Sequence, residues 1–336
     1  MTILPAPGAH GGDGARVAAA LGVDPAAVLD LSASLNPAAP DASDVVAKHV
    51  EAVGRYPDAG AATEALAAAM AVDPDRLLLT NGGAEAIALV ASDLGRGWAD
   101  PCDFALYRRH LPELDPGGPR FRSNPHNPTG RLAGDGDEAA VWDEAFFPLA
   151  TGRWTRGDGA IVVGSLTKLL ACPGLRVGYV LAPEGDLIGR LARRQPRWAV
   201  NGLAAAALPD LLATADLVGW AATVAELRKA LGDVLGAHGL EPRPSDANYV
   251  LCARAGGLRE RLAPYGVVVR DCASFVLPGH ARVAVPDSAG LARLEAALED
   301  MVRRSGPLCP TEEPEEPGEP EEPEEPGERE SSCGAG

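Results

Sequence analysis

Cysteine pairs, long apolar runs and lysine are all scarce in this chain. The first two shortages argue against particular classes of protein, and the third draws attention to individual lysines. The six cysteines are scattered and form no C-x-x-C pair, so no metal site is expected and a reducing cytoplasm is the simplest location. No apolar run is long enough to span a bilayer, and the N-terminus shows no basic segment followed by an apolar one. We therefore expect neither a membrane anchor nor a secretion signal.

Basic residues are outnumbered by acidic ones, 30 against 47, which gives a formal net charge of −17. Nucleic acid is not expected as the main partner, because phosphate binding needs clustered Lys and Arg. Residues 311–330 hold eleven Glu and one Arg, so they carry ten of the 17 net negative charges. Such a segment repels itself and has no apolar surface to bury, and residues 307–336 are predicted to form a disordered acidic tail.

Lysine is the rarest cation, with Lys48, Lys168 and Lys229 standing against 27 arginines. In a chain that uses Arg wherever either cation would serve, a lysine that persists is a candidate for a chemical role. Lys48 and Lys229 fall in predicted amphipathic helices, whereas Lys168 follows a predicted strand. Lys168 is therefore the strongest candidate for a reactive amine.

Strand-like and helix-like segments alternate through residues 41–240, which predicts a large α/β domain with a parallel sheet covered on both faces. Residues 241–306 change to a small α+β domain, and residues 1–40 form an arm and a further segment of that small domain. Residues 106–143 have little periodic pattern and are predicted to be mostly loop. The predicted strands of the large domain are 76–80, 160–164 and 177–181, a glycine turn is predicted at 81–83, and predicted helices cover about 42–53, 84–94, 184–197, 202–213 and 216–237.

The segment 164–179, GSLTKLLACPGLRVGY, carries the most chemistry. An amine that forms a Schiff base needs a fixed position and a lowered pKa, which Lys168 could have after a strand. A phosphate bound beside it needs hydroxyl donors and a cation, and Ser165, Thr167 and Arg176 supply them. The alternative interpretation is a strand–loop–strand unit with incidental polar residues.

Three further segments add weaker signals. In SNPHNPTG, residues 123–130, an Asn held by turns can donate to a phenolate oxygen, although the motif could also be a simple turn. In VWDEAF, residues 141–146, a buried acid could keep a pyridine nitrogen protonated, although Asp-Glu more often begins a helix. In LTNGGAEAI, residues 79–87, glycines leave a helix N-terminus open to a phosphate.

Together and in this order, the four segments resemble the fold-type I pyridoxal-phosphate (PLP) enzymes of the aspartate aminotransferase superfamily over residues 10–304. The resemblance implies an α/β fold with a mostly parallel central sheet, a small α+β C-terminal domain and PLP as the cofactor. It also implies that Lys168 forms the Schiff base and that Asp143 pairs with the pyridinium nitrogen. The cofactor-binding residues that it implies are Gly83, Ala84, Phe104, Asn127, Asp143, Ser165, Thr167, Lys168, Arg176 and Tyr56.

Two of these residues carry particular implications. Phe104 resembles the aromatic residue that stacks on the cofactor ring, although a core aromatic is the alternative. Tyr56, in RYPDAG, resembles the tyrosine that reaches the phosphate of the neighbouring subunit. The resemblance therefore implies a homodimer with shared active sites.

Two terminal segments resemble a subgroup, the threonine-phosphate decarboxylases of cobalamin biosynthesis, with the histidinol-phosphate aminotransferases as close relatives. These segments are HGGD at 10–13, followed by LDLSASLNP, and VRDCASFVLPGHARVAV at 269–285. The resemblance implies a phosphorylated amino-acid substrate, with Arg282 near its carboxylate, Arg270 at its phosphate and His10 as a further donor. The expected reaction is decarboxylation of L-threonine O-3-phosphate. The alternatives are a PLP-dependent aminotransferase and, in another class, a degenerate PLP-fold protein that only binds a partner.

The chain also departs from the family pattern. Only 23 positions separate Phe104 from Asn127 and 16 separate Asn127 from Asp143, which is fewer than relatives usually have. We expect a reduced large domain in which at least one strand–helix unit is lost or shortened. Phe146 stands where many aminotransferases have a tyrosine that bonds the cofactor's 3′-oxygen.

Overall fold

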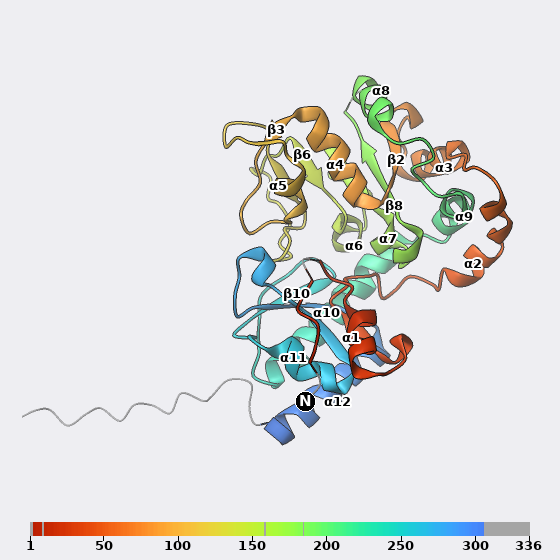
Figure 1. Cartoon of the computed structure of the whole chain (residues 1–336). Coiled ribbons are helices and arrows are strands. Elements are labelled where there is room, and N and C mark those ends of the chain that lie inside the picture. Colours follow the sequence, from red (N-terminus) through yellow and green to blue (C-terminus); the bar gives the residue numbers. More distant parts are fainter. Residues whose placement is uncertain (1–2, 9, 158, 184, 306–336) are drawn as a thin grey trace, which may run out of the picture.

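Two lobes make up the chain in a computed structural model, which describes residues 3–8, 10–157, 159–183 and 185–305 (Figure 1). Each lobe contains a five-stranded sheet. The sheet of the upper lobe in Figure 1 is called the larger sheet here because its strands hold slightly more residues, and that of the lower lobe is called the smaller sheet. The predicted tail at 307–336 lies outside the described residues.

The larger sheet has the strand order β2-β8-β7-β6-β5. Strands β5, β6 and β7 are parallel, whereas β8 runs antiparallel to both β2 and β7. The expectation of a mostly parallel α/β sheet is therefore confirmed, with β8 as the exception. The bounds are β2 (Leu77–Asn81), β8 (Val177–Leu181), β7 (Ile161–Ser165), β6 (Val141–Asp143) and β5 (Phe121–Ser123).

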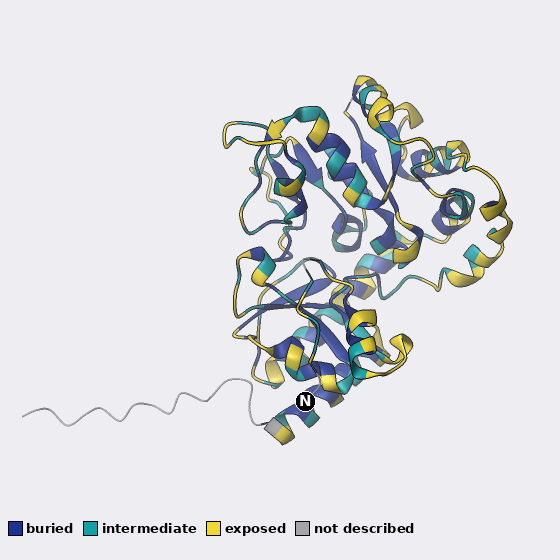
Figure 2. Cartoon of the chain, viewed as in Figure 1, coloured by how far each residue is buried: buried dark blue, intermediate teal, exposed yellow. Residues whose placement is uncertain are grey.

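Helices cover both faces of this sheet. Successive strand residues point to opposite faces, so each strand contributes side chains to the core on both sides. Val163 and Val180 pack into the hydrophobic cluster that α4, α5 and α8 cover. Val162 and Tyr179 pack into the other cluster, under α3, α7 and α9 (Figure 2 shows the strands buried between exposed outer helix faces). The bounds are α2 (Ser43–Ala47), α3 (Gly60–Met70), α4 (Gly82–Leu94), α5 (Leu106–His110), α6 (Phe147–Thr151), α7 (Leu166–Leu169), α8 (Gly185–Arg194) and α9 (Gly202–Ala213).

The far edge of the sheet is reduced, as the short spacings predicted. Strands β3 (Arg96–Gly97) and β4 (Glu113–Leu114) have two residues each and form a small parallel pair. Trp98 bridges this pair to Arg120, next to β5, and the Phe121 N–H donates to the Trp98 carbonyl over 2.8 Å. The β3–β4 pair is therefore short but remains attached beside β5.

Residues 106–143 are mostly outside helices and strands, as predicted, but they also contain α5, β4, β5 and β6. Strands β5 and β6 left no sign in the sequence, because three residues each are too few to show alternation. Two other local predictions were wrong. The predicted helix at about 42–53 is instead α2 followed by a 3₁₀ turn at Val50–Gly54. The predicted glycine turn ends earlier, because α4 already begins at Gly82.

The smaller sheet joins the two ends of the chain. Its order is β1-β11-β12-β10-β9, and β1 runs parallel to β11. Helices α11 and α12 and the last half of α10 pack on it around Leu231, Leu258 and Leu298, whereas Val17 of α1 packs in a separate small cluster. The bounds are α1 (Gly14–Leu21), β1 (Leu29–Leu31), α10 (Leu217–Ala237), β9 (Glu241–Pro242), β10 (Tyr249–Ala253), α11 (Leu258–Leu262), β11 (Val267–Asp271), β12 (Ala281–Ala284) and α12 (Ser288–Ser305).

Helix α10 connects the lobes. Its first half contributes Trp220 and Val224 to the core of the larger lobe, and its second half contributes Leu231 and Leu235 to the core of the smaller lobe. No described helix is by itself long and apolar enough to cross a membrane, and only α9 and α10 taken together, bent by 84°, would pass that test.

Candidate active site

A pocket of about 340 Å³ is lined by residues of both lobes. This volume suits a small ligand with its charged groups. The structure brings twelve of the thirteen predicted site residues together here, and only Tyr56 lies elsewhere. The twelve are His10, Gly83, Ala84, Phe104, Asn127, Asp143, Ser165, Thr167, Lys168, Arg176, Arg270 and Arg282.

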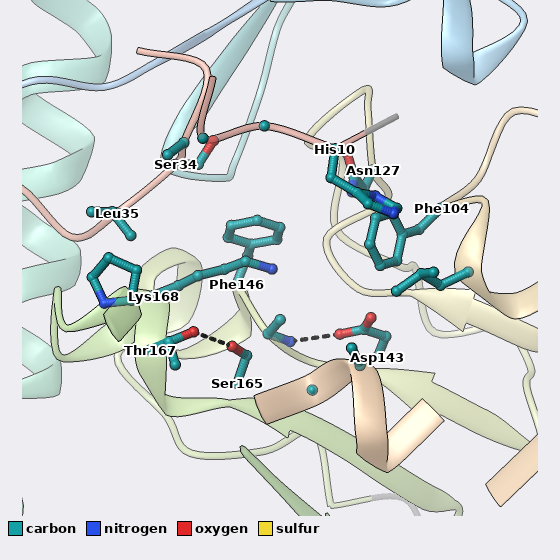
Figure 3. Close-up of a pocket in the computed structure, with 18 of the residues that line it drawn as sticks. His10, Ser34, Leu35, Phe104, Asn127, Asp143, Phe146, Ser165, Thr167 and Lys168 are labelled. Carbon is teal, nitrogen blue, oxygen red and sulfur yellow. Dashed lines mark hydrogen bonds between the residues drawn. The ribbon is translucent and has the colours of Figure 1, made fainter. Parts of the chain in front are cut away.

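Lys168 reaches the pocket from α7, the single helical turn that follows β7. Its side chain keeps some exposed area because it faces the hollow, but protein surrounds it closely. Burial lowers the pKa of the Lys168 amine from 10.5 to about 8, Asp143 partly opposes this shift, and Arg282 and Arg176 add to it. Its Nζ lies 4.2 Å from the centre of the Phe146 ring (Figure 3). An amine with this pKa is partly neutral, and thus nucleophilic, near pH 7.

Asp143 ends β6 on the other side of the pocket (Figure 3). Its Oδ1 accepts from the Ala145 N–H over 3.0 Å, and its Oδ2 accepts from the Tyr107 hydroxyl over 2.8 Å. Burial, followed by the charge of Asp143, raises the pKa of Tyr107 well above its usual value, so this phenol remains a donor. Tyr107 was missed by sequence reasoning, and its spacing of three from Phe104 was the available signal.

An anion cradle lies where β2 enters α4. Gly82 has a left-handed φ of +74°, and a Cβ on it would lie 2.5 Å from Nη2 of Arg176. Arg176 itself has a left-handed φ of +56°, a conformation that costs free energy in a non-glycine residue and holds its side chain against the turn. The hydroxyls of Ser165 and Thr167 lie 2.8 Å apart, and the N-terminus of α4 adds backbone donors.

Asn127 and Phe104 are fixed by a buried carboxylate that sequence reasoning also missed. Asp103 accepts from the Ser123 hydroxyl over 2.5 Å and from the Ser123 N–H over 3.0 Å, and its Oδ1 also accepts from the Phe104 N–H. Ser123 Oγ in turn accepts from the Asn127 N–H over 2.7 Å. Burial raises the pKa of Asp103. The Asp103 carboxylate therefore fixes the backbone positions of Asn127 and Phe104, which both lie on the pocket wall.

Two arginines lie side by side on neighbouring strands of the smaller sheet and line the pocket. Arg270 of β11 and Arg282 of β12 are paired in register and are only 3% and 6% exposed. Arg282 donates to Asn127 Oδ1 over 2.5 Å and lies 4.5 Å above the Tyr249 ring. Burial lowers the pKa of Arg270 to about 10, with Arg282 adding to the effect, but both remain cations at neutral pH.

His10 closes the pocket from the N-terminal arm. Its ring contacts Phe104 edge to face, with 5.4 Å between the ring centres, and the Gly8 carbonyl accepts from Arg270 over 2.7 Å. Burial, followed by the charge of Arg270, lowers the pKa of His10. The arm therefore holds a largely neutral imidazole beside a cationic wall.

Tyr56 does not join this pocket. It is 76% exposed and stacks on Trp198, with 4.4 Å between the ring centres, in a separate hollow beside Gly202. Both rings of this stacked pair are exposed to solvent.

The pocket fits a flat ring with a phosphate and a ring nitrogen. The cradle at Gly82 offers donors and a cation for a phosphate, Asp143 offers an acceptor for a protonated nitrogen, and Lys168 offers an amine for covalent attachment. PLP has these three groups, so the residues present suit it.

Comparisons with known proteins agree with this fit. The family model of aminotransferase class I and II matches residues 121–298. A threonine-phosphate decarboxylase of Salmonella typhimurium is 31% identical, over 89% of this chain and 98% of its own length. A histidinol-phosphate aminotransferase of Halobacterium salinarum is 29% identical, over 85% of this chain and 94% of its own. A solved histidinol-phosphate aminotransferase of Sinorhizobium meliloti in complex with pyridoxal-5′-phosphate superposes with a TM-score of 0.74 at 17% identity, over 86% of this chain and 94% of that one.

Proposed function

We propose that this chain, which belongs to the class I and II aminotransferase family and is an enzyme dependent on PLP, decarboxylates L-threonine O-3-phosphate to (R)-1-aminopropan-2-ol O-2-phosphate. The reaction would serve cobalamin biosynthesis. We expect the protein to lie in the cytoplasm, because its scattered cysteines suit a reducing compartment.

The observation that carries this proposal is a pair of buried cations that lines the same pocket as Lys168. Arg270 and Arg282 are register partners on neighbouring strands, so together they suit a substrate with two anionic groups. We assign Arg282 to the surroundings of the substrate carboxylate, and Arg270 with His10 to the phosphate. L-Threonine O-3-phosphate has both groups on adjacent carbons.

The chain's own residues then have distinct tasks. PLP, when bound, supplies a ring that accepts the electrons of a bond broken at the substrate's α-carbon. Ser165, Thr167 and Arg176 would hold its phosphate, and Asp143, oriented by Tyr107, would keep its ring nitrogen protonated. Lys168 would provide the amine for covalent attachment, and the same amine, when free and protonated, would be the acid that returns a proton to the substrate's α-carbon.

We also propose a homodimer in which Tyr56 of one subunit reaches the phosphate site of the other. The support is that Tyr56 is exposed and lines a different hollow from its own subunit's pocket, while the exposed Val50 and Val53 lie close to it in the chain. Such a contact would cover the Tyr56–Trp198 pair.

An aminotransferase is the second candidate, and the 29% identity to a histidinol-phosphate aminotransferase favours it. It would use the same pocket but release a proton from the α-carbon instead of CO2, and it would need a keto acid as the second substrate. The interpretation as a protein that only binds a partner has no support, since the relatives are enzymes and all twelve pocket residues are present.

Product analysis separates the candidates. Purified protein with PLP and L-threonine O-3-phosphate, but no keto acid, should release CO2 and 1-aminopropan-2-ol phosphate in equal amounts, and Lys168→Ala should release neither. Turnover that appears only when a keto acid is added would replace the proposal with an aminotransferase.

A further inference from the structure

Ser34 is a pocket residue to which neither the proposed function nor the family resemblance gives a role. It is 3% exposed and lines the pocket, and its hydroxyl, itself buried, makes no hydrogen bond to any described residue. The other described pocket hydroxyls are engaged. Ser32 accepts from the Gly12 N–H over 2.9 Å and donates to Asp30 over 2.5 Å, and Ser165 and Thr167 bond each other.

The chain around Ser34 is fixed to both lobes. The Ser34 carbonyl accepts from the Asn248 side chain over 3.0 Å, on the small-lobe side. Two residues later, the Asn36 N–H donates to the Lys168 carbonyl over 3.0 Å, and its side chain donates to the Leu169 carbonyl over 2.9 Å. The backbone therefore cannot swing the Ser34 hydroxyl out to water without losing these contacts.

A buried hydroxyl without a partner destabilises a protein, and folded proteins keep few such groups. When the group faces a pocket, a ligand atom can supply the missing hydrogen bond. Ser34 is therefore a candidate contact for a ligand that enters the pocket, because no described residue partners its hydroxyl.

The position of Ser34 indicates which part of a ligand it meets. Figure 3 shows Ser34 and Leu35 on the side of Lys168 and Phe146, whereas His10 and Phe104 lie together on the opposite side and Asp143 and Ser165 lie below. In this view Ser34 lies on the Lys168 side of the pocket and away from His10. Asn248, which holds Ser34, precedes Tyr249, whose ring lies 4.5 Å from the Arg282 guanidinium.

We propose that the Ser34 hydroxyl donates a hydrogen bond to the substrate carboxylate, which it holds together with Arg282. This inference rests on the proposed function only in that the substrate has a carboxylate and a phosphate. Two donors from different directions fix where the carboxylate lies, and its position sets the rotation about the bond between the substrate nitrogen and the α-carbon. Ser34 thereby helps to determine which bond at that carbon is aligned to break.

Two ligands without an amine test this assignment on the PLP-loaded enzyme, because they cannot react. The first, 3-phosphoglycerate, has a carboxylate and a phosphate on a three-carbon chain, and the second, glycerol 1-phosphate, replaces the carboxylate with an alcohol. Ser34→Ala should weaken binding of 3-phosphoglycerate by roughly 10-fold or more, as expected for a lost hydrogen bond to a charged group, and should leave glycerol 1-phosphate within about twofold. Calorimetric titration measures both affinities.

A matched control uses the neighbouring serine. Ser34→Ala should leave the thermal midpoint unchanged or slightly raised, because it removes a buried group without a partner. Ser32→Ala should lower the midpoint, because the Ser32 hydroxyl bonds to the arm at Gly12 and Asp13.

Three results would overturn the assignment: equal weakening of both ligands, no weakening of either, or wild-type protein that binds 3-phosphoglycerate no more tightly than glycerol 1-phosphate. The proposed reaction is tested separately by CO2 release. A wild-type enzyme that releases none contradicts the decarboxylase proposal, while the two titrations still decide the role of Ser34.

Discussion

At the scale of single residues, the Lys168 amine links the stability of the folded protein to pH. Burial holds its pKa near 8 in the folded protein, against 10.5 when it is solvated. The unfolded chain therefore binds more protons between these values, and the protein without cofactor should gain stability as the pH rises through this window. Below pH 8 the Lys168 amine is protonated in the folded protein, so the full free-energy cost of burying its charge is present.

Lys168→Met should therefore stabilise the cofactor-free protein at pH 7, because it keeps the packing of the stem and removes the charge. The gain should be at most about 3 kcal/mol, since a tenfold change in proton affinity corresponds to about 1.4 kcal/mol. It should shrink as the pH rises from 8 to 10.5. Urea unfolding of both proteins across this range measures the effect, and a gain that does not depend on pH would contradict it.

Tyr107 is the second residue whose role can be tested alone. Tyr107→Phe removes the donor to Asp143 but leaves the ring packed against Phe104 and Phe121. We expect PLP to bind roughly tenfold more weakly, because hydrogen bonds to charged groups contribute about 1.5–3 kcal/mol. The visible absorption of the bound cofactor should also change its dependence on pH.

The matched control for this variant is Tyr265→Phe, which lies in the small lobe beside Arg304. It should leave cofactor affinity unchanged. If Tyr107→Phe binds PLP as tightly as wild type, and with the same pH dependence, Asp143 does not need its phenol partner.

At the scale of elements, the contact between β8 and the start of α4 shapes the anion cradle. Gly178 of β8 lies against this turn, and a Cβ on it would come within 2.5 Å of Gly82 and Gly83 backbone atoms and within 2.8 Å of the Gly164 carbonyl. Backbone atoms cannot move aside as a flexible side chain can. The cradle therefore depends on a glycine in a neighbouring strand.

Gly178→Ala should push the first turn of α4 away from β8, destabilise the protein by about 1–3 kcal/mol or more, and weaken PLP binding. Gly232→Ala is the control, because Gly232 lies inside α10 and a Cβ there meets nothing within 4 Å. That change should stabilise the helix by up to about 1 kcal/mol. Denaturant unfolding and cofactor titration of both variants provide the comparison, and equal behaviour would contradict the packing argument.

At the scale of the whole molecule, the proposed dimer predicts complementation between two inactive variants. Lys168→Ala removes the reactive amine, and Tyr56→Ala removes the residue that we assign to the partner's site. In a mixed dimer, one site then has both defects and the other has neither. Co-refolding the two variants in equal amounts should restore up to about a quarter of all sites, because half of randomly paired dimers are mixed.

The control is a mixture of the two variants without refolding, which keeps each in its own dimers and should remain inactive. Activity that stays absent after co-refolding, in a sample whose mass shows mixed dimers, would mean that Tyr56 does not serve the neighbouring subunit.

The sequence by itself determined the chemistry of the site and the family. Lys168, Asp143, Asn127 and Arg176 belong to short motifs in which residue type and order carry the information, because a covalent amine, a paired carboxylate and an anion cradle each require particular side chains. Strands such as β7 and β8 could also be predicted, since five consecutive residues suffice to show their apolar pattern.

Only the tertiary structure decided what surrounds those side chains. The three-residue strands β5 and β6 leave no periodic signal, and their place in the sheet is set by pairing with β7. Asp103, Tyr107 and Ser34 have unremarkable neighbours in the sequence, and they matter because folding buries them against residues tens of positions away. Whether a polar group has a partner depends on the packing of both lobes, and no local pattern encodes that.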